Sequence, residues 1–453
     1  MTRAAVLAVV VLAAAALAAP ARASFGPPVQ LATGSYLFNV AVDTDAAGST
    51  TLLASNFGHG PRLFERPAGG AWSVAAPLPG NPAGVAGPVV DAAGDGALGI
   101  AWRVDKPRTY TGIAVAMRDP GGTLSEPTTI ADADAGGVRH PALAIDPAGD
   151  ALLAYNTATN EVHLNMRGAI AIAHRDRGGS FSEPKVVDRT PSSAPAVAIG
   201  RDGTGVVAWS HDQRVYAVSA DADGGIGKVK RIASPGGVAK LVAAAGEDGA
   251  ATLAWVSHHP VGKGRSARTR YDVRALGRTA GRAFGGVVTV ASTTDFVRSV
   301  AVAADEQARV TLAWGRENFG EDRSVGVNGI TSAVLATTAQ AGKPFPVVRV
   351  VAKRARRYLA PPTVVAANGR VALAWGVSGD RRDLGVQAAV GRPAAIGSPQ
   401  TVAAETLTNR GFGAQTLISA TLAPNGTATV LYAVPTEMPP PAPAFALMAS
   451  DGS

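Results

Sequence analysis

The chain has 453 residues, no cysteine and a formal net charge of +8, and 47% of its residues are hydrophobic. A chain without cysteine has no disulfides, no thiol nucleophile, no cysteine-ligated zinc and no cysteine-linked haem. Its mild positive charge comes without a long basic run interleaved with aromatic residues, so we expect no nucleic acid partner. The charge suits an anionic polymer outside the cell.

Residues 1–23 have the features of a secretory signal peptide. A positive charge at Arg3 precedes an apolar run, which is followed by a small-residue cleavage pattern ending at Ala23. We expect cleavage before Ser24, secretion, and no membrane span in the mature chain. The alternative is an N-terminal membrane anchor, but the run is shorter than the roughly 20 residues that a span needs.

One motif recurs along the rest of the chain. It is an apolar strand, a turn rich in Asp, Asn and Gly, and a second apolar strand that ends in Ala followed by an aromatic residue, as in VVDAAGDGALGIAW, VAIGRDGTGVVAW and VVAANGRVALAW. The ends of the copies, including a degenerate first copy, lie 46 to 61 residues apart, at Ala54, Trp102, Tyr155, Trp209, Trp255, Trp314, Trp375 and Tyr432. A motif repeated about every 50 residues is typical of a propeller or a solenoid. We expect the repeated aromatic residues to pack between neighbouring units.

The remainder of each unit supplies two more strands. A third strand such as TGIAVAMRD is followed by a Gly-rich turn and a fourth strand such as GGTLSEPTTI. Four short antiparallel strands per unit, repeated eight times, predict an all-β protein with a single eight-bladed β-propeller over residues 24–453. Seven blades, an open stack and two four-unit domains are the alternatives.

The two ends of the predicted propeller complement each other. The eighth unit supplies three strands, the last of them within APAFALMASDGS, while SFGPPVQLAT after the predicted cleavage site matches the fourth-strand type. We therefore expect Phe25–Ala32 to pair with the strand around Ala442–Ala449 and to complete the last blade. Such pairing hides a sheet edge and closes the ring.

The unit resembles those of the sialidase-like, BNR-type β-propeller superfamily. It is most similar to secreted actinobacterial repeat proteins with units of the form AVDxxGxxLVAW and VQAAxRPAGG, and the matching residues are Ala144–Tyr155 and Val386–Pro393. The resemblance extends over the whole predicted mature chain. It implies the fold and carbohydrate recognition, although a fold alone does not specify a function.

The variable loops indicate where a ligand would bind. The connections from second to third strands, and those between blades, vary in length and share one face of a propeller, and variable loops on a rigid scaffold commonly carry binding sites. An array of arginines there would bind carboxylate, sulfate or phosphate groups, although an ordinary solvated surface is the alternative. The candidate ligand-binding residues are Arg103, Arg139, His140, His211, Asp212, His258, Arg316, Glu317, Arg357, Tyr358, Asp380, Arg381, Glu405 and Arg410.

Two functions fit this pattern. The first is a monomeric binding or scaffold module for an anionic glycan, the cell wall or an extracellular protein, without a metal or cofactor. The second is a divergent sialidase-like glycoside hydrolase or lyase, for which two of Asp212, Glu317, Asp380 and Glu405 would have to converge to about 5–9 Å. The chain has no Gly-x-Ser-x-Gly motif and no Ser-x-Asp-x-Gly-x-Thr-Trp box, so the sequence assigns no catalytic residue and favours the first function.

Overall fold

The computed structural model describes most of the chain beyond the predicted signal peptide. The described residues are 24–35, 37–56, 59–80, 82, 85–106, 109–132, 138–157, 168–234, 236–246, 248–263, 267–318, 330–355, 357–378, 383–408, 418–435 and 444–452. Residues 1–23 lie outside them, so cleavage before Ser24 remains a prediction. In the described residues no helix is long and apolar enough to span a membrane, and the one helix is a 3-10 turn at Gly94–Gly96.

The prediction of eight antiparallel blades is confirmed, and the first four blades follow one pattern. Each is a four-stranded sheet in which chain order equals spatial order. Blade 1 contains β2 (Leu37–Thr44), β3 (Thr50–Asn56), β4 (His59–Arg66) and β5 (Ala76–Pro77). Blade 2 contains β6 (Val85–Ala92), β7 (Leu98–Lys106), β8 (Thr109–Arg118) and β9 (Thr128–Asp132). Blade 3 contains β10 (Val138–Ile145), β11 (Ala151–Thr157), β12 (Gly168–Arg175) and β13 (Lys185–Ser192). Blade 4 contains β14 (Ala196–Ile199), β15 (Gly205–His211), β16 (Arg214–Ala220) and β17 (Lys230–Ala233).

The last four blades repeat this pattern with two variations. Blade 5 contains β18 (Gly237–Ala245), β19 (Ala251–Val261), β20 (Arg268–Arg278) and β21 (Val288–Thr293). Blade 6 contains β22 (Val300–Ala304), β23 (Arg309–Asn318), β24 (Thr331–Gln340) and β25 (Arg349–Ala355). Blade 7 divides its inner strand into β26 (Tyr358–Leu359) and β27 (Thr363–Ala367), pairs them with β28 (Arg370–Ser378) and β29 (Asp383–Arg392), and divides its outer strand into β30 (Ala395–Ile396) and β31 (Gln400–Thr408). Blade 8 contains β32 (Ile418–Leu422), β33 (Ala428–Pro435), β34 (Ala444–Gly452) and, from the other end of the chain, β1 (Val29–Ser35).

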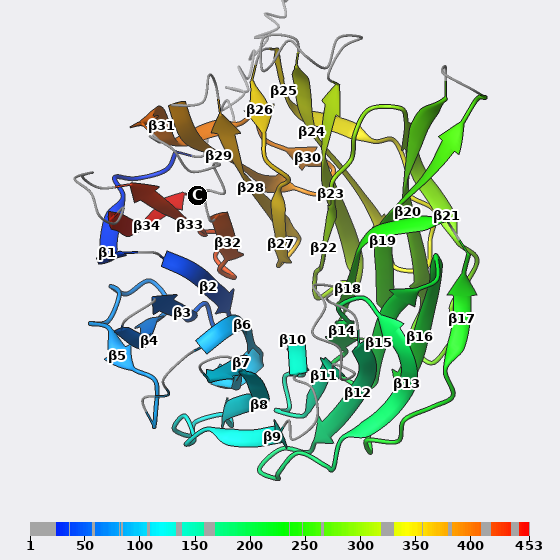
Figure 1. Ribbon diagram of the computed structural model, residues 1–453. Helices are drawn as coiled ribbons and strands as arrows, with labels where there is room; N and C mark the ends of the chain where they lie inside the picture. The colour runs from blue at the N-terminus through cyan, green and yellow to red at the C-terminus, as the bar shows by residue number, and fades with distance from the viewer. Residues whose placement is uncertain are drawn as a thin grey trace, which may run out of the picture.

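The blades form a closed ring around a central axis (Figure 1). The innermost strand of each blade contacts the innermost strand of the next, and β32 of blade 8 contacts β2 of blade 1. The outermost strands lie on the rim. Closure leaves the short outer strands as the only sheet edges facing outward in the described part, which limits edge-to-edge association.

The predicted closure of the last blade by the N-terminal segment is confirmed. In β1, Val29 pairs with Ala449 and Ser35 pairs with Ala444 of β34, with a bulge between Gln30 and Ala32. Phe25 forms an additional bridge to Gly452. The blue and red ends of the chain therefore lie in one sheet (Figure 1).

Aromatic side chains fill the spaces between blades, as the repeat predicts. Each is at most 2% exposed, and each packs with residues of the preceding blade: Trp102, Tyr155, Trp209, Trp255, Trp314, Trp375 and Tyr432. Between blades 8 and 1 the equivalent residue is the small Ala54, and Leu52 and Phe64 of blade 1 pack there with Leu431 and Leu447. The core is therefore a ring of separate apolar layers between sheets.

Arginines at the ends of the third strands join neighbouring blades, and we call them latch arginines. Arg66 donates to Asp451 at 2.6 Å, Arg118 forms an ion pair with Glu65, and Arg175 donates to Asp119 at 2.9 Å. In each pair the carboxylate belongs to the preceding blade. The fourth, Arg278 of blade 5, donates to Ser219 and Gly205 of blade 4 and forms no ion pair with a described residue.

Candidate functional site

The channel opens on two faces of different chemistry. The turns between first and second strands lie on one, which we call the turn face. The connections between second and third strands, and those between blades, lie on the other, the loop face. Because each inner strand runs from the loop face to the turn face, its first residues border the loop-face mouth of the channel.

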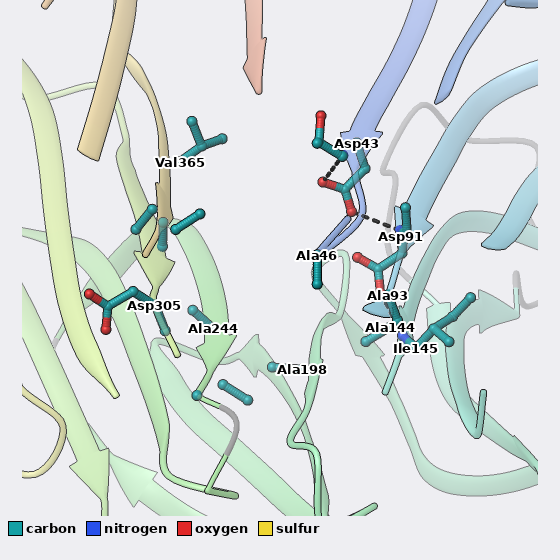
Figure 2. Close-up of a pocket in the computed structure, with 18 of the residues that line it drawn as sticks. Asp43, Ala46, Asp91, Ala93, Ala144, Ile145, Ala198, Ala244, Asp305 and Val365 are labelled. Atoms are coloured by element: carbon teal, nitrogen blue, oxygen red, sulfur yellow. Dashed lines mark hydrogen bonds between the residues drawn. The ribbon is translucent and has the colours of Figure 1, made fainter. Parts of the chain in front are cut away.

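At the turn face, residues of all eight blades enclose a cavity of about 410 Å³. Its wall consists mostly of Ala, Val, Ile and Leu from the ends of the inner strands. Asp43 and Asp91 lie beside each other on one wall and Asp305 lies on the opposite wall (Figure 2). The turn-face end of the channel therefore combines apolar strand ends with the Asp43–Asp91 pair and with further charged residues, Asp45, Arg201, Asp305 and Glu306.

The Asp43–Asp91 pair connects the inner strands of three blades. Asp43 accepts a hydrogen bond from the backbone amide of Ala92 at 2.8 Å, and Asp91 accepts one from Ile145 at 2.5 Å, each across a blade boundary (Figure 2). Burial raises the pKa of Asp91 to about 6, and burial together with the Asp91 charge raises the pKa of Asp43 well above its usual range. The pair therefore shares a proton while satisfying backbone donors, which is chiefly a structural role.

Bulges distort the inner strands close to the loop face. The register shifts between Ala86 and Val89 in blade 2, and the bulge residue Gly87 has φ +55°. In blade 3 the equivalent His140 has φ +50°, an uncommon conformation for a residue with a side chain. Bulges of this kind commonly turn a side chain toward a functional site.

Blades 5 and 6 place basic side chains at the same bulge. Lys240 lies within the bulge of β18, where its side chain is exposed to solvent although burial lowers its pKa. In blade 6, Arg298 lies between the Phe296–Glu317 bridge and the first pair of β22, and its side chain is exposed.

Arg298, Glu317 and Tyr358 converge where blades 6 and 7 meet, and with Phe296 and Tyr271 we call them the loop-face cluster. Arg298 lies close enough to act on the pKa of Tyr358, and its charge also acts on Glu317. Its guanidinium carbon lies 5.4 Å from the centre of the Phe296 ring, and Tyr271 packs edge-on against that ring at 5.3 Å. The exposed Arg298 guanidinium thus lies over one aromatic ring, which a second ring supports, and it acts on a phenol and a carboxyl nearby.

Glu317 is protonated over an unusual range of pH. Its side chain lies at the end of β23 and is 4% exposed, and burial raises its pKa to about 7, although the Arg298 charge opposes the rise. Burial also raises the pKa of Tyr358, and the Glu317 charge adds to that rise. Near pH 7 the cluster therefore holds a permanent cation, a phenol, and a carboxyl that can donate or accept a hydrogen bond.

Other predicted site residues lie near this cluster or along the same face. His258 lies beside Tyr271 with ring centres 6.2 Å apart. Arg316 forms an ion pair of 3.2 Å with Asp295. Arg357 precedes Tyr358, and Arg103 lies on β7; both are partly buried and have partners in the structure.

His211 and Asp212 belong to a packed hairpin of blade 4. Asp212 and Gln213 both have positive φ, so β15 and β16 are joined by a two-residue type I′ turn in place of a long variable loop. His211 stacks on Tyr216 at 4.1 Å and lies 3.3 Å from Asp188, which also accepts the indole hydrogen of Trp209. The side chain of His211 therefore packs within its own hairpin and against the preceding blade.

The remaining candidates lie outside what the structure describes. Asp380, Arg381 and Arg410 are outside the described residues, and only the backbone is described for Arg139 and Glu405. Among the described residues, the carboxyl that acts on Tyr358 is that of Glu317. Within the described part, no group of three or more His, Asp or Glu side chains gathers closely enough to hold a metal ion.

Sequence reasoning missed the residues that the bulges expose. Arg298 and Lys240 precede or interrupt inner strands, where the repeat predicted only apolar pairing. A signal existed, since both are charged residues within otherwise apolar stretches, FVRSVAVAA and GVAKLVAAA. Asp43 and Asp91 were treated as turn residues, yet they lie two residues before the turns, where most other blades have Ala.

Comparisons with known proteins show the fold. No protein-family model and no curated protein matches the chain. Among solved structures it is similar to a lectin from Burkholderia pseudomallei, at 14% identity and a TM-score of 0.51 over 80% of this chain and 98% of that one. Lower-scoring similarities include an ulvan lyase, at 11% identity and a TM-score of 0.47 over 83% and 97% of the two chains, and a Hadza microbial sialidase, at 14% identity and 0.35 over 77% and 75%. At this identity, the likeness to the lectin shows a shared fold alone.

Proposed function

We propose that this protein is a secreted propeller that binds a glycan bearing acidic groups at the loop-face cluster. The observation that carries the proposal is the exposed Arg298 guanidinium over the Phe296 ring, with Tyr358 and Glu317 close enough for Arg298 to act on their pKa values. The same cation-rich face was the one that the sequence favoured.

The chemistry of the cluster suits a sugar acid. A guanidinium forms paired hydrogen bonds with a carboxylate or sulfate group. A protonated Glu317 and the Tyr358 hydroxyl can donate to sugar or carboxylate oxygens, while the aromatic rings offer apolar faces to the sugar ring. Lys240, at the bulge of the neighbouring blade, adds a second positive charge at the channel mouth. An acidic glycan would therefore meet charge, hydrogen bonds and apolar contact at one place.

A glycan array followed by calorimetry tests this proposal. We expect retention of uronate- or sulfate-bearing glycans and weak retention of neutral ones. Arg298→Ala should weaken binding by about 10- to 100-fold, the range for a lost charge-assisted hydrogen bond, and Arg298→Lys should recover only part of it. Arg349→Ala, an exposed arginine at the start of β25, is the matched control and should bind like the wild type. Equal binding by the Arg298→Ala and wild-type chains would reject the site.

A second candidate is acid–base chemistry on the same class of glycan. The pKa of about 7 for Glu317 favours it, since a general acid or base works best when its pKa lies near the working pH. Hydrolysis would require a second carboxylate about 5–9 Å away, for which Asp380 and Glu405 are candidates outside the described side chains. Release of reducing ends from the retained glycans, lost in Glu317→Gln, would support catalysis; no turnover of any retained glycan would leave binding alone.

A further inference from the structure

A second recess lies on the rim of the molecule, between blades 4 and 5 and away from the loop-face cluster. It has a volume of about 430 Å³, within the range of roughly 300–1,000 Å³ that is usual for ligand sites. Five of its lining residues are cationic and none is acidic: Lys228, Lys230, Arg231, Arg278 and Arg282. Phe284 supplies an apolar wall.

Arg278, at the base of this recess, is a latch arginine without a carboxylate. It lies at the end of β20, where it is 8% exposed. It donates to the Ser219 hydroxyl at 3.2 Å and to the Gly205 carbonyl at 3.3 Å, both in blade 4, and lies over the Phe284 ring at 5.6 Å. Its Nε has no hydrogen-bond partner among the described residues.

The strand registers show which residue of blade 4 lies at the position of the latch carboxylate of blade 1. Arg66 ends β4 opposite Thr50, and Ala220 ends β16 opposite Gly205, so Ser219 occupies in blade 4 the position that Glu65 occupies in blade 1. Glu65 is the partner of the next blade's latch arginine. Between blades 4 and 5 the position of Glu65 is a serine. Asp221 lies at the position of Asp119, the partner of Arg175, but it forms no ion pair with Arg278, so this buried guanidinium lacks a contacting carboxylate.

The cationic side chains around the recess are not neutralised by contacting carboxylates of the described residues, which favours the binding of an anion. Asp202 and Asp221 act on Arg278 only through space, while burial lowers the pKa of its guanidinium. Lys228, Lys230, Arg231 and Arg282 are exposed, and none forms an ion pair with a described residue. Because a nearly buried cation without a contacting counter-charge is costly, an anion in this recess gains more than one on an open surface.

We propose that this recess binds a sulfate group of a sulfated glycan, with the anion taking the place of the missing carboxylate beside Arg278. The surplus of cations favours a ligand with several negative charges, and Phe284 offers the sugar an apolar contact. The recess is compact and has one aromatic side chain, whereas single-stranded nucleic acid is typically bound along an extended groove with several stacked aromatic rings. A sulfated sugar chain therefore fits these contacts better than a nucleic acid.

The test places the missing carboxylate back on the chain. Ser219→Glu should form the latch to Arg278, raise the melting temperature and weaken binding of dextran sulfate oligosaccharides at least tenfold. Ser219→Gln has the same size without the charge and should bind like the wild type. Both are measured in the Arg298→Ala background, so that the loop-face cluster contributes nothing and failure of either proposal is seen separately.

Other ligands test whether the recess recognises the sulfate groups of a sugar chain. Uncharged dextran should not bind, and polygalacturonate oligosaccharides should bind more weakly than dextran sulfate. Binding would fall with added salt, and Lys228→Ala with Lys230→Ala should reduce that dependence. The proposal is overturned if Ser219→Glu binds dextran sulfate as well as Ser219→Gln does. It is also overturned if inorganic sulfate alone binds as tightly as dextran sulfate, or if a DNA oligonucleotide binds more tightly.

Discussion

Three acidic sites show how surroundings decide the role of a carboxyl group in this protein. Asp272 donates nothing and accepts from Ser292 at 2.5 Å and Arg274 at 3.0 Å, and these partners lower its pKa despite its burial. Glu317 and the Asp43–Asp91 pair are buried without a contacting cation in the described part, and their pKa values rise. Asp272 therefore stays charged and is held by its ion pairs, whereas the carboxyl groups of the other sites keep their protons to higher pH than usual.

Glu317 should make glycan binding depend on pH. Its pKa of about 7 means that the side chain is neutral at pH 6 and charged at pH 8, where it repels an acidic ligand. We expect affinity to fall roughly tenfold between these values, equivalent to about 1.4 kcal/mol. In Glu317→Gln the affinity should stay level over the same range, as measured by calorimetry. An equally steep fall in the variant would assign the pH dependence to another group.

Asp43 and Asp91 should make stability depend on pH in the opposite sense to an ordinary salt bridge. Their pKa values are raised in the folded state, so their contribution is complete below about pH 4 and is lost as pH rises through about 6. The expected loss is about 1–2 kcal/mol after allowance for solvent in the channel. In the Asp43→Asn variant, the free energy of unfolding, measured by urea denaturation, should change less between pH 4 and 7 than in the wild type. Glu317 titrates in the same window, so the comparison is made in the Glu317→Gln background, where an unchanged slope would contradict the shared proton.

Individual site residues were the least predictable feature of the sequence. Glu317, Tyr358 and Arg316 follow repeat positions that the motif locates, so their place at the loop face could be inferred. Arg298 and Lys240 depend on bulges, which insert residues between paired positions and are not marked by the alternation of apolar residues. His211 was predicted to lie on an open loop, because the two-residue turn after it has no glycine to indicate it.

At the level of elements, the interfaces between blades depend on one large side chain each. Trp255 on β19 packs with Ala208 and Val215 of blade 4 and is fully buried. Trp255→Ala should lower the free energy of unfolding by about 3–5 kcal/mol, the usual range for large aromatic residues in cores. Trp255→Phe should cost less because it keeps most of the apolar volume. Urea denaturation measures both changes. If the free energy of unfolding of the alanine variant fell by less than 1 kcal/mol, the packing of Trp255 between blades 4 and 5 would not be essential to the interface.

The repeat made these elements predictable for a physical reason. Each blade must bury both faces against its neighbours, so the same apolar and aromatic positions recur in every unit. Trp102, Trp314 and Trp375 therefore identify equivalent strands from sequence alone. Blade 7 departs from the pattern, since Pro361 and Pro362 cannot donate to a ladder and divide its inner strand into β26 and β27.

At the level of the whole molecule, closure was predictable but its register was not. The surplus strand type at one end and the missing one at the other identified the partners. The observed pairing runs from Val29–Ser35 with Ala444–Ala449, a few residues further along β1 than expected, and a bulge near Gln30 shifts it. Hydrogen bonds from Gly26 to Asp451 and from Ser450 to Gly26 extend the contact between the N-terminal segment and β34.

Removing the closing strand should destabilise the entire ring. Deleting residues 24–35 exposes the edge of β34 and removes Leu31 and Ala32 from the apolar layer that holds Leu447. We expect a loss of several kcal/mol, on the order of the burial of a few apolar side chains. Deleting residues 1–23 should leave the melting temperature unchanged, because the eight sheets are complete without them. Equal melting temperatures for the two truncations would contradict closure by β1.

Hydrogen exchange with and without the acidic glycan that is best retained on the array tests the location of the functional site most directly. The two faces of the ring are chemically distinct, so bound glycan should protect peptides on one and not the other. We predict slower exchange around residues 296–298, 315–318 and 357–359, with no change around 43–46 and 91–94. Protection confined to the turn-face segments, with the 296–298 region unchanged, would contradict glycan binding at the loop-face cluster.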